Sequence, residues 1–246
     1  MTTIDASSAV ADLHRLLWAA GISPPFVIVG YQNSAFDARL YADRYPGKVV
    51  GMVLVAPNVP NQPKRLSAIA PALAPYLAQV PSFDRHCTAA AVRGQMYPGT
   101  PAFSQCIYTP SDVTMPKALK RLVQRRHEQP SWWQDYSATY SGEAASSSEV
   151  MREQRTYDDM PLVVLTTTQD IDSLPIPKNQ TASLLRAWIA WQREVAKLSH
   201  RGVDFVVKGS TEDIPIDRPA TVVSAIDEVV KQARHGSSGD VPHVHG

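Results

Sequence analysis

The sequence predicts an α/β protein with a mainly parallel sheet flanked by helices, and two observations support this class. Continuous apolar, β-branched runs at 26–30 and 49–57 are typical of strands that a parallel sheet buries on both faces, and the strand pattern resumes at 160–167 and 202–209. Segments with apolar residues at helical spacing separate these runs, which is the alternation expected of β-α-β units. With 246 residues, of which 44% are hydrophobic, the chain is long enough to bury a sizeable core.

Two helices are predicted in the first half of the core. Apolar residues share one face of the segment 7–19, namely Val10, Leu13, Leu17 and Ala20. Asp5 or Ser7 can cap the N-terminus of this amphipathic helix, and "GISPP" ends it. A second helix at 34–45 connects the first two strands into a β-α-β unit.

The second half of the core alternates in the same way. Apolar residues at helical spacing predict a helix between the last two strands, namely Leu184, Leu185, Trp188, Val195 and Leu198. A last helix follows "DRP", with Pro219 near its first turn. Its predicted buried stripe consists of Val222, Val223, Ile226, Val229 and Val230. Ligands gather at the carboxyl ends of parallel strands, so we expect a site among the segments 30–34, 56–60, 166–173 and 208–214.

Between the two halves, residues 58–158 are interpreted as a helical lid insertion. Prolines are frequent there, and the basic stretch "KALKRLVQRRHEQ" and the aromatic stretch "PSWWQDYSATY" have no strand pattern. The predicted core therefore comprises residues 1–57 and 159–235. The tail at 236–246 is rich in Gly and Ser and is expected to be flexible. The serines at 146–148 are interpreted as polar lid surface.

Composition and charge exclude several classes of partner. The 24 Lys and Arg residues nearly balance the 23 Asp and Glu residues, and no basic run interleaves with aromatic residues, so we expect no nucleic-acid binding. The N-terminal residues show no basic leader before an apolar stretch, and no window approaches about 18 uninterrupted apolar residues. We therefore predict a soluble, cytoplasmic protein whose natural partner is a small molecule and not a membrane.

The two cysteines, Cys87 and Cys106, are interpreted as free thiols. So sparse a pair more often remains reduced than forms a disulfide framework. Together with His86 they lack C-x-x-C spacing, so no metal site is predicted. No motif indicates a cofactor.

Four blocks of the chain occur in a recognisable order. They are "DLHRLLWAAGI", "FVIVGYQNSAFDARLYADRYPGKVVGMVLVAP", "MPLVVLTTTQD" and "GVDFVVKGSTEDIPIDRPATVVSAIDEVV". This order resembles that of the α/β-hydrolase superfamily, in its lidded esterase and epoxide-hydrolase-like branch. The resemblance implies a partial α/β-hydrolase fold with a helical lid insertion, in which a nucleophile, an acidic residue and a histidine act together above the sheet.

The resemblance places Gln32 at the nucleophile position. In the family the nucleophile lies within G-x-S-x-G, on a sharp strand-to-helix turn that exposes a serine hydroxyl. The five motif positions match residues 30–34 here. A neutral carboxamide has no oxygen or nitrogen that a base can activate at ordinary pH, so covalent catalysis from Gln32 is not expected. Ser34 lies two residues further on and needs a shifted turn to be reactive.

The resemblance places Glu212 at the position of the histidine base, within "GSTEDIPIDRP". An accessible glutamate is a weak base at neutral pH and has no proton to give to a leaving group. The family's acidic position matches Asp170, with Asp172 as an alternative. Of the three catalytic positions, only the acidic one keeps its residue type.

The resemblance also implies that strand 26–30 is a sheet edge. In the family, strands that form one half of the sheet and a loop that donates an oxyanion N–H precede the helix "DLHRLLWAAGI", which here lies close to Met1. Proteins normally pair, cover or blunt such an edge, and nothing in "FVIVG" blunts it. We therefore expect that a second copy or a partner chain pairs with strand 26–30.

These replacements predict a hydrolase-like pseudoenzyme without conventional serine-hydrolase activity. Loss of one triad member typically lowers the rate by about 10⁴ to 10⁶, and two members are replaced here. Such a protein would bind a small apolar molecule or a partner chain. The residues expected to contact a small ligand are Tyr31, Gln32, Asn33, Trp132 and Trp133.

An enzyme of a different kind is the open alternative. In this hypothesis Asp170 and Glu212 act on a water or substrate proton, while Gln32 and a backbone N–H hold an oxygen. An active hydrolase or a lyase or cyclase of this kind needs acid–base groups and a dry pocket rather than a serine.

Overall fold

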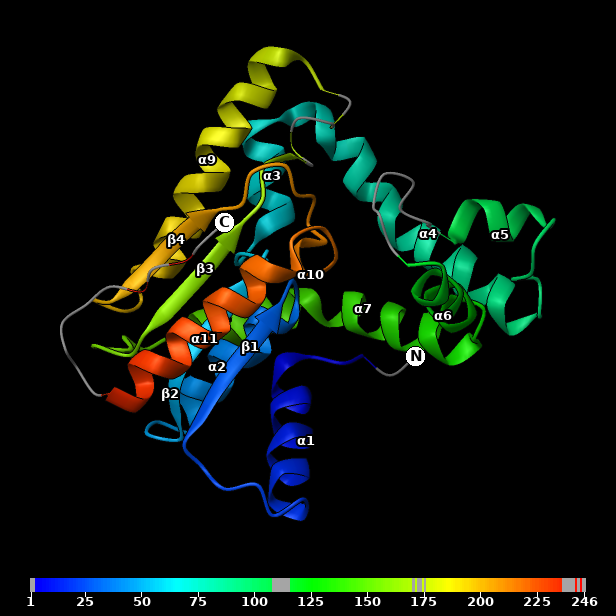
Figure 1. Ribbon diagram of the computed structural model, residues 1–246. Helices are drawn as coiled ribbons and strands as arrows, with labels where there is room; N and C mark the ends of the chain where they lie inside the picture. The colour runs from blue at the N-terminus through cyan, green and yellow to red at the C-terminus, as the bar shows by residue number, and fades with distance from the viewer. Residues whose placement is uncertain are drawn as a thin grey trace. The chain divides into compact units, whose positions relative to one another are not determined.

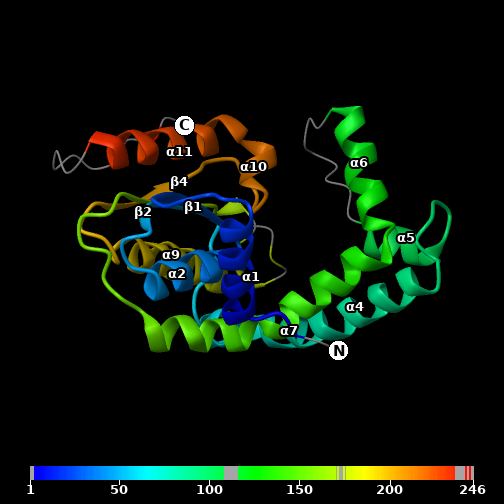
Figure 2. The same cartoon turned by 90° about the horizontal axis from the view of Figure 1, so that it is seen from below.

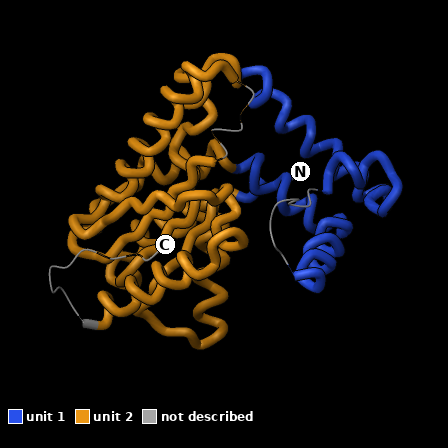
Figure 3. Tube along the Cα trace, turned by 45° about the horizontal axis from the view of Figure 1, so that its top comes forward, with its two compact units in different colours: residues 1–4, 74–142 blue, residues 5–73, 143–246 orange. Residues whose placement is uncertain are grey.

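The computed structural model describes residues 3–107, 116–169, 171, 174, 176–235, 242 and 244. The chain divides into two compact units, which Figure 3 shows in different colours. Unit 1 consists of residues 1–4 and 74–142, and unit 2 consists of residues 5–73 and 143–246. The predicted lid insertion, 58–158, thus encloses the internal segment of unit 1.

The sheet of unit 2 has four described strands in the order β1-β2-β3-β4. Their bounds are β1 Phe26–Tyr31, β2 Val49–Val55, β3 Leu162–Thr166 and β4 Gly202–Val206. All three neighbouring pairs are parallel, with Val29 opposite Val53 and Val53 opposite Val163. The predicted parallel sheet is therefore confirmed, and β1 is an edge strand of the sheet that the described residues form.

Helices cover both faces of this sheet (Figures 1 and 2). Helix α2, Ser34–Arg44, packs on β1 and β2, and α9, Lys178–Ala196, packs on β3 and β4. Helix α11, Pro219–His235, covers the opposite face. The other elements of unit 2 are α1 Ala6–Ala19, α3 Gln62–Ile69, the 3₁₀ helix η1 Pro71–Leu73 and α10 Ile214–Asp217.

One detail of these helices agrees with the sequence prediction and another differs from it. Asp5 caps α1, as one of the two predicted caps, and its side chain accepts a hydrogen bond from the Ser8 N–H. On α11, however, Val223 is 55% exposed, so including it in the buried stripe was wrong. Val229 is buried as predicted, and Ala225 is buried as well, because the face of α11 toward the sheet is centred between Val222 and Ile226.

Unit 1 is helical in its described residues. It contains α4 Ala74–Val92, α5 Pro101–Cys106, α6 Lys117–His127 and the N-terminal part of α7, Pro130–Glu153. Its core consists of Cys87, Ala90, Ala91, Met96, Ala102, Cys106, Ile107 and Trp133. Among the described residues, no helix is long and apolar enough to cross a membrane.

Cys87 and Cys106 form a disulfide, so the prediction of free thiols was wrong. Helix α4 carries Cys87 and the last residue of α5 is Cys106, with their Cα atoms 5.7 Å apart. That distance lies inside the range that a disulfide needs. The pairing arises from the packing of two helices, which cysteine spacing alone does not indicate.

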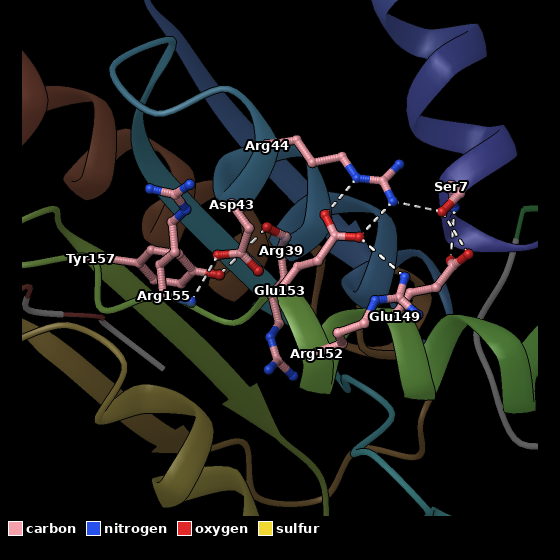
Figure 4. A network of polar contacts seen from close by, with 9 residues as sticks. All are labelled: Ser7, Arg39, Asp43, Arg44, Glu149, Arg152, Glu153, Arg155 and Tyr157. Atoms are coloured by element: carbon pink, nitrogen blue, oxygen red, sulfur yellow. Dashed lines mark hydrogen bonds and ion pairs between the residues drawn. The ribbon is translucent and has the colours of Figure 1, made fainter.

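A polar network ties α1 and α2 to the C-terminal half of α7 within unit 2 (Figure 4). Arg44 of α2 donates to both carboxylate oxygens of Glu153, each at 2.8 Å. The same guanidinium donates to the Ser7 hydroxyl at 2.7 Å, and Ser7 donates to Glu149. These paired hydrogen bonds hold the pKa of Glu153 down at about 2.

Two serines of α7 contribute to the same packing, so the interpretation of the run 146–148 as polar surface was wrong for them. Ser146 and Ser147 are buried. Their hydroxyls accept hydrogen bonds from the backbone N–H groups of Ala6 and Asn61, each at 2.9 Å. The Ser146 hydroxyl thereby satisfies the N–H of the buried Ala6, which would otherwise have no partner.

Candidate functional site

The turn after β1 has the geometry of a nucleophile elbow. Gln32 has φ of 49°, in the left-handed region that residues other than Gly rarely adopt. At Gly30, a Cβ would lie 2.8 Å from the Ser34 carbonyl oxygen, so only glycine permits this close approach of strand and helix. The backbone thus turns sharply from β1 into α2 and presents residue 32 at its tip.

Neighbouring backbone groups hold this tip in place. The Gln32 N–H donates to the Val55 carbonyl at 3.0 Å, and its carbonyl accepts from the Ala35 N–H at 3.1 Å. It also accepts from the Asn58 N–H at 3.3 Å. The turn is therefore fixed both to its own helix and to the end of β2.

Two polar groups at the tip have no hydrogen-bond partner among the described residues. One is the side-chain carboxamide of Gln32, which is partly exposed. The other is the backbone N–H of Asn33, which lies at the N-terminus of α2. Both are donors, and the positive end of the helix dipole favours an oxygen beside the N–H.

Asn58 and Glu143 form a polar chain beside the elbow. Asn58 Nδ2 donates to Asn33 Oδ1 at 2.8 Å and approaches Glu143 Oε1 at 3.5 Å. Burial raises the pKa of the Glu143 carboxyl above its ordinary value, while the contact with Asn58 acts in the opposite direction. Sequence reasoning missed both residues. Asn58 lies in the predicted segment 56–60, whereas Glu143 lies on a helix with no sequence signal for the site.

The loop after β4 approaches the elbow through Asp213. The Tyr31 hydroxyl donates to Asp213 Oδ1 at 2.7 Å. The loop itself is held by Asp217, whose carboxylate accepts from both the N–H and the hydroxyl of Thr211 at 2.7 Å. Glu212, the residue at the predicted base position, is exposed in this loop.

The remaining predicted site residues lie either outside the described residues or in unit 1. Asp170 and Asp172 lie outside the described residues. Trp132 and Trp133 belong to unit 1, where Trp133 is 3% exposed and forms part of the core. Within the described residues, no cluster of three or more His, Cys, Asp or Glu side chains is arranged to hold a metal ion.

Ser34 does not take over the place of Gln32. Its side chain is exposed in the first turn of α2 and is hydrogen-bonded to Asp37. Burial, followed by the nearby charges of Glu149 and Asp5, raises the pKa of Asp37 to about 7. Ser34 is thus paired with a carboxyl group on its own helix.

Comparison of the whole structure with solved structures identifies the architecture. A Pseudomonas aeruginosa protein assigned as an epoxide hydrolase matches with a TM-score of 0.59 and 16% identity, over 94% of this chain and 73% of that chain. The α/β hydrolase MGS-M2 from a Medee basin deep-sea metagenome library matches with a TM-score of 0.58 and 14% identity, over 94% and 73%. The chain has the α/β-hydrolase fold.

A third solved structure agrees with this fold. A carboxylesterase structure from Nitrososphaera gargenis matches this α/β-hydrolase fold with a TM-score of 0.58 and 13% identity, over 95% of this chain and 74% of that chain. No protein-family model and no curated protein matches the sequence. In the vocabulary of the α/β-hydrolase fold, the turn at residues 30–34 is the elbow, and Gln32 is at its tip.

Proposed function

We propose that this α/β-hydrolase-fold protein has no conventional serine-hydrolase activity and binds a small molecule at its elbow. One observation carries the proposal: Gln32 occupies the tip of the turn at a φ of 49°. The strained backbone that normally presents a nucleophile is kept, and a side chain without nucleophilic chemistry occupies its place.

The proposed ligand combines an apolar body with an oxygen that accepts hydrogen bonds. The N–H of Asn33 and the carboxamide of Gln32, which have no partner within the described part of the chain, are donors available to that oxygen. The chain from Asn33 through Asn58 to Glu143 fixes the Asn33 side chain, so the site needs little reorganisation when a ligand binds. These contacts support binding and provide no attacking group.

An esterase assay tests the absence of activity. With p-nitrophenyl acetate and butyrate, we expect wild type not to exceed the protein-free rate, and Gln32→Ser/Glu212→His to gain turnover. Turnover by wild type that Glu212→Gln abolishes would instead support the acid–base enzyme that uses Asp170 and Glu212. Turnover unaffected by changes at residues 32 and 212 would contradict both hypotheses.

A binding assay tests the ligand site directly. Butyrate carries an apolar chain and an oxygen acceptor, so we expect it to raise the melting temperature of wild type. Gln32→Ala should reduce that shift, because the change removes a donor at the tip. Gln79→Ala is the matched control, since Gln79 is exposed on α4. Equal shifts for all three proteins would place the bound butyrate elsewhere.

A partner chain at β1 is the second candidate function. Val29 on this edge strand is 45% exposed, and on the preceding helix α1 Trp18 is 84% exposed. Large apolar side chains on an uncovered sheet edge are typical of a surface that pairs with another chain. A mass above the monomer by light scattering, reduced to the monomer by Val29→Lys, would support this function. A monomer at all concentrations, in the absence of any partner, would count against self-association.

A further inference from the structure

Helix α6 is strongly basic. Its eleven residues, Lys117–His127, include no acidic residue. Five of them carry a permanent positive charge, namely Lys117, Lys120, Arg121, Arg125 and Arg126. None of the five forms an ion pair with a carboxylate among the described residues. Glu128, which follows the helix, accepts a hydrogen bond from the uncharged Gln124 at 3.0 Å.

The same helix exposes apolar side chains. Leu119 is 41% exposed and Leu122 is 57% exposed, and no residue of α6 is buried. At helical spacing the two leucines share one side with Val123, whereas Lys117, Arg121 and Arg125 lie on the other. The basic side includes a shallow hollow lined by Arg121, Gln124 and Arg125.

The combination of a basic side and an exposed apolar stripe on α6 is typical of a helix that binds the surface of a membrane. A helix of this composition lies parallel to a membrane, with its leucines among the acyl chains and its cations beside anionic headgroups. Arg126 lies between the leucines on the helical wheel, and its long side chain can extend to the headgroups from there.

Two other partners fit these observations less well. A nucleic acid would pair with the cations but leave Leu119 and Leu122 exposed to water. A second copy that docked through the same helix would place one set of five positive charges against another, which repels. An anionic lipid surface satisfies both the charges and the leucines.

We propose that α6 is a peripheral binding site for membranes that contain anionic lipids. Binding involves the surface of the membrane only, in agreement with the lack of a spanning helix among the described residues. The proposal is independent of ligand binding at Gln32, because none of its residues belongs to the elbow.

Sedimentation with lipid vesicles tests this proposal. Wild type should sediment with vesicles of phosphatidylcholine that contain about a third phosphatidylserine, and not with pure phosphatidylcholine. Arg121→Glu/Arg125→Glu should lower the affinity on the order of 100-fold, because each reversal removes one attraction and adds one repulsion. Lys64→Glu/Arg186→Glu is the matched control, since both residues are exposed in unit 2. It should lower the affinity much less.

The leucines distinguish a membrane from other polyanions. Leu119→Ser/Leu122→Ser should weaken vesicle binding by about tenfold or more, because the apolar contacts are lost. Circular dichroism of each variant verifies that the helices remain folded. If the leucine variant binds vesicles as wild type does, or if wild type prefers heparin or duplex DNA to the anionic vesicles, the proposal is wrong. Absence of wild-type binding to anionic vesicles would also overturn it.

Discussion

The Tyr31 hydroxyl donates a hydrogen bond of 2.7 Å to the Asp213 carboxylate. This contact joins the residue before the elbow tip to the residue after Glu212. The contact therefore holds the turn at residues 30–34 and the loop after β4 together.

Removing this contact should loosen the loop after β4. We expect Tyr31→Phe to lower the free energy of unfolding by about 1 kcal/mol, because a partly buried carboxylate loses a donor. Urea denaturation measures the change. Tyr76→Phe is the matched control, since Tyr76 is 54% exposed, and it should have no effect. Equal stabilities of the two variants would show that the Tyr31 contact does not stabilise the loop.

The strain at the elbow tip predicts a stabilising substitution. Gln32→Gly should raise the free energy of unfolding by about 0.5–1 kcal/mol, because glycine adopts a φ of 49° without steric cost. Ala35→Gly, on the first turn of α2, should lower it by about 1 kcal/mol. A loss of stability in Gln32→Gly would mean that side-chain contacts of Gln32 outweigh the strain.

Gly30 should tolerate no larger residue. A Cβ there would lie 2.8 Å from the Ser34 carbonyl oxygen and 2.9 Å from the Ala35 Cα, both of which are backbone atoms. We expect Gly30→Ala to cost about 2–4 kcal/mol in thermal or chemical denaturation, because β1 and α2 must move apart. A cost below about 1 kcal/mol would show that the elbow can relax.

The raised pKa of Asp37 predicts how stability depends on pH. Its pKa in the folded protein is about 7, against an ordinary value of 3.8, so the folded state holds a proton that the unfolded state releases between these values. The contribution of Asp37 to stability is full below pH 3.8 and is lost as pH rises through 7. The contribution of Asp43 to stability also falls as pH rises, since burial raises its pKa to about 6.

Replacing Asp37 should remove this dependence. We expect Asp37→Asn to be more stable than wild type by about 1–3 kcal/mol at pH 8 and to differ little at pH 4. Asp227→Asn on α11 is the control, since Asp227 is exposed, and it should behave as wild type at both values. Melting temperatures from pH 4 to pH 8 measure the difference. Parallel curves for wild type and Asp37→Asn would contradict the assignment.

Glu153 has the opposite effect on the pH dependence of stability, because its contribution is lost when the pH falls. Its pKa is about 2 in the folded protein, against an ordinary 4.5, because Arg44 and Arg152 donate to its carboxylate. The stability that it provides is therefore present above pH 4.5 and lost as pH falls toward 2. Glu153→Gln should flatten the fall in melting temperature over that range. If the melting temperature of Glu153→Gln fell with decreasing pH as steeply as that of wild type, the ion pair of Glu153 with Arg44 would not be stabilising.

The disulfide predicts a separate effect in unit 1. Cys87→Ser/Cys106→Ser should destabilise the protein by about 2–4 kcal/mol, since the cross-link between α4 and α5 restricts the unfolded chain. Limited proteolysis should then cut between residues 87 and 106 faster than in wild type. Unchanged cleavage in the variant would show that helix packing alone holds this region.

The strands were predictable because each strand pattern is local. The runs that became β1 and β2 are apolar and β-branched over their whole length, which a helix buried on one side does not require. Gly30 was also informative, since the close approach of strand and helix requires a glycine at this position of the sequence. The resemblance to the α/β-hydrolase superfamily placed Gln32 at the tip, and its positive φ agrees with that position.

The partners of the elbow were not predictable in the same way. Glu143 contacts Asn58 across 85 positions of sequence, and neither residue belongs to a motif. Ser146 was read as surface because serine is usually exposed, yet it accepts a hydrogen bond from Ala6 in the interior. Such contacts depend on how α7 packs, and the periodicity of one helix does not specify its partner.

The bond between Cys87 and Cys106 also has a practical meaning for every experiment on this protein. Structural disulfides are characteristic of oxidising compartments and rare in the cytosol, so the cross-link and the cytoplasmic assignment expected from the sequence imply different cellular environments. A strong thiol reductant would break this disulfide. Unit 1 would therefore differ covalently between a preparation made with the reductant and one made without it. Counting free thiols in each preparation should therefore precede any comparison of their activities.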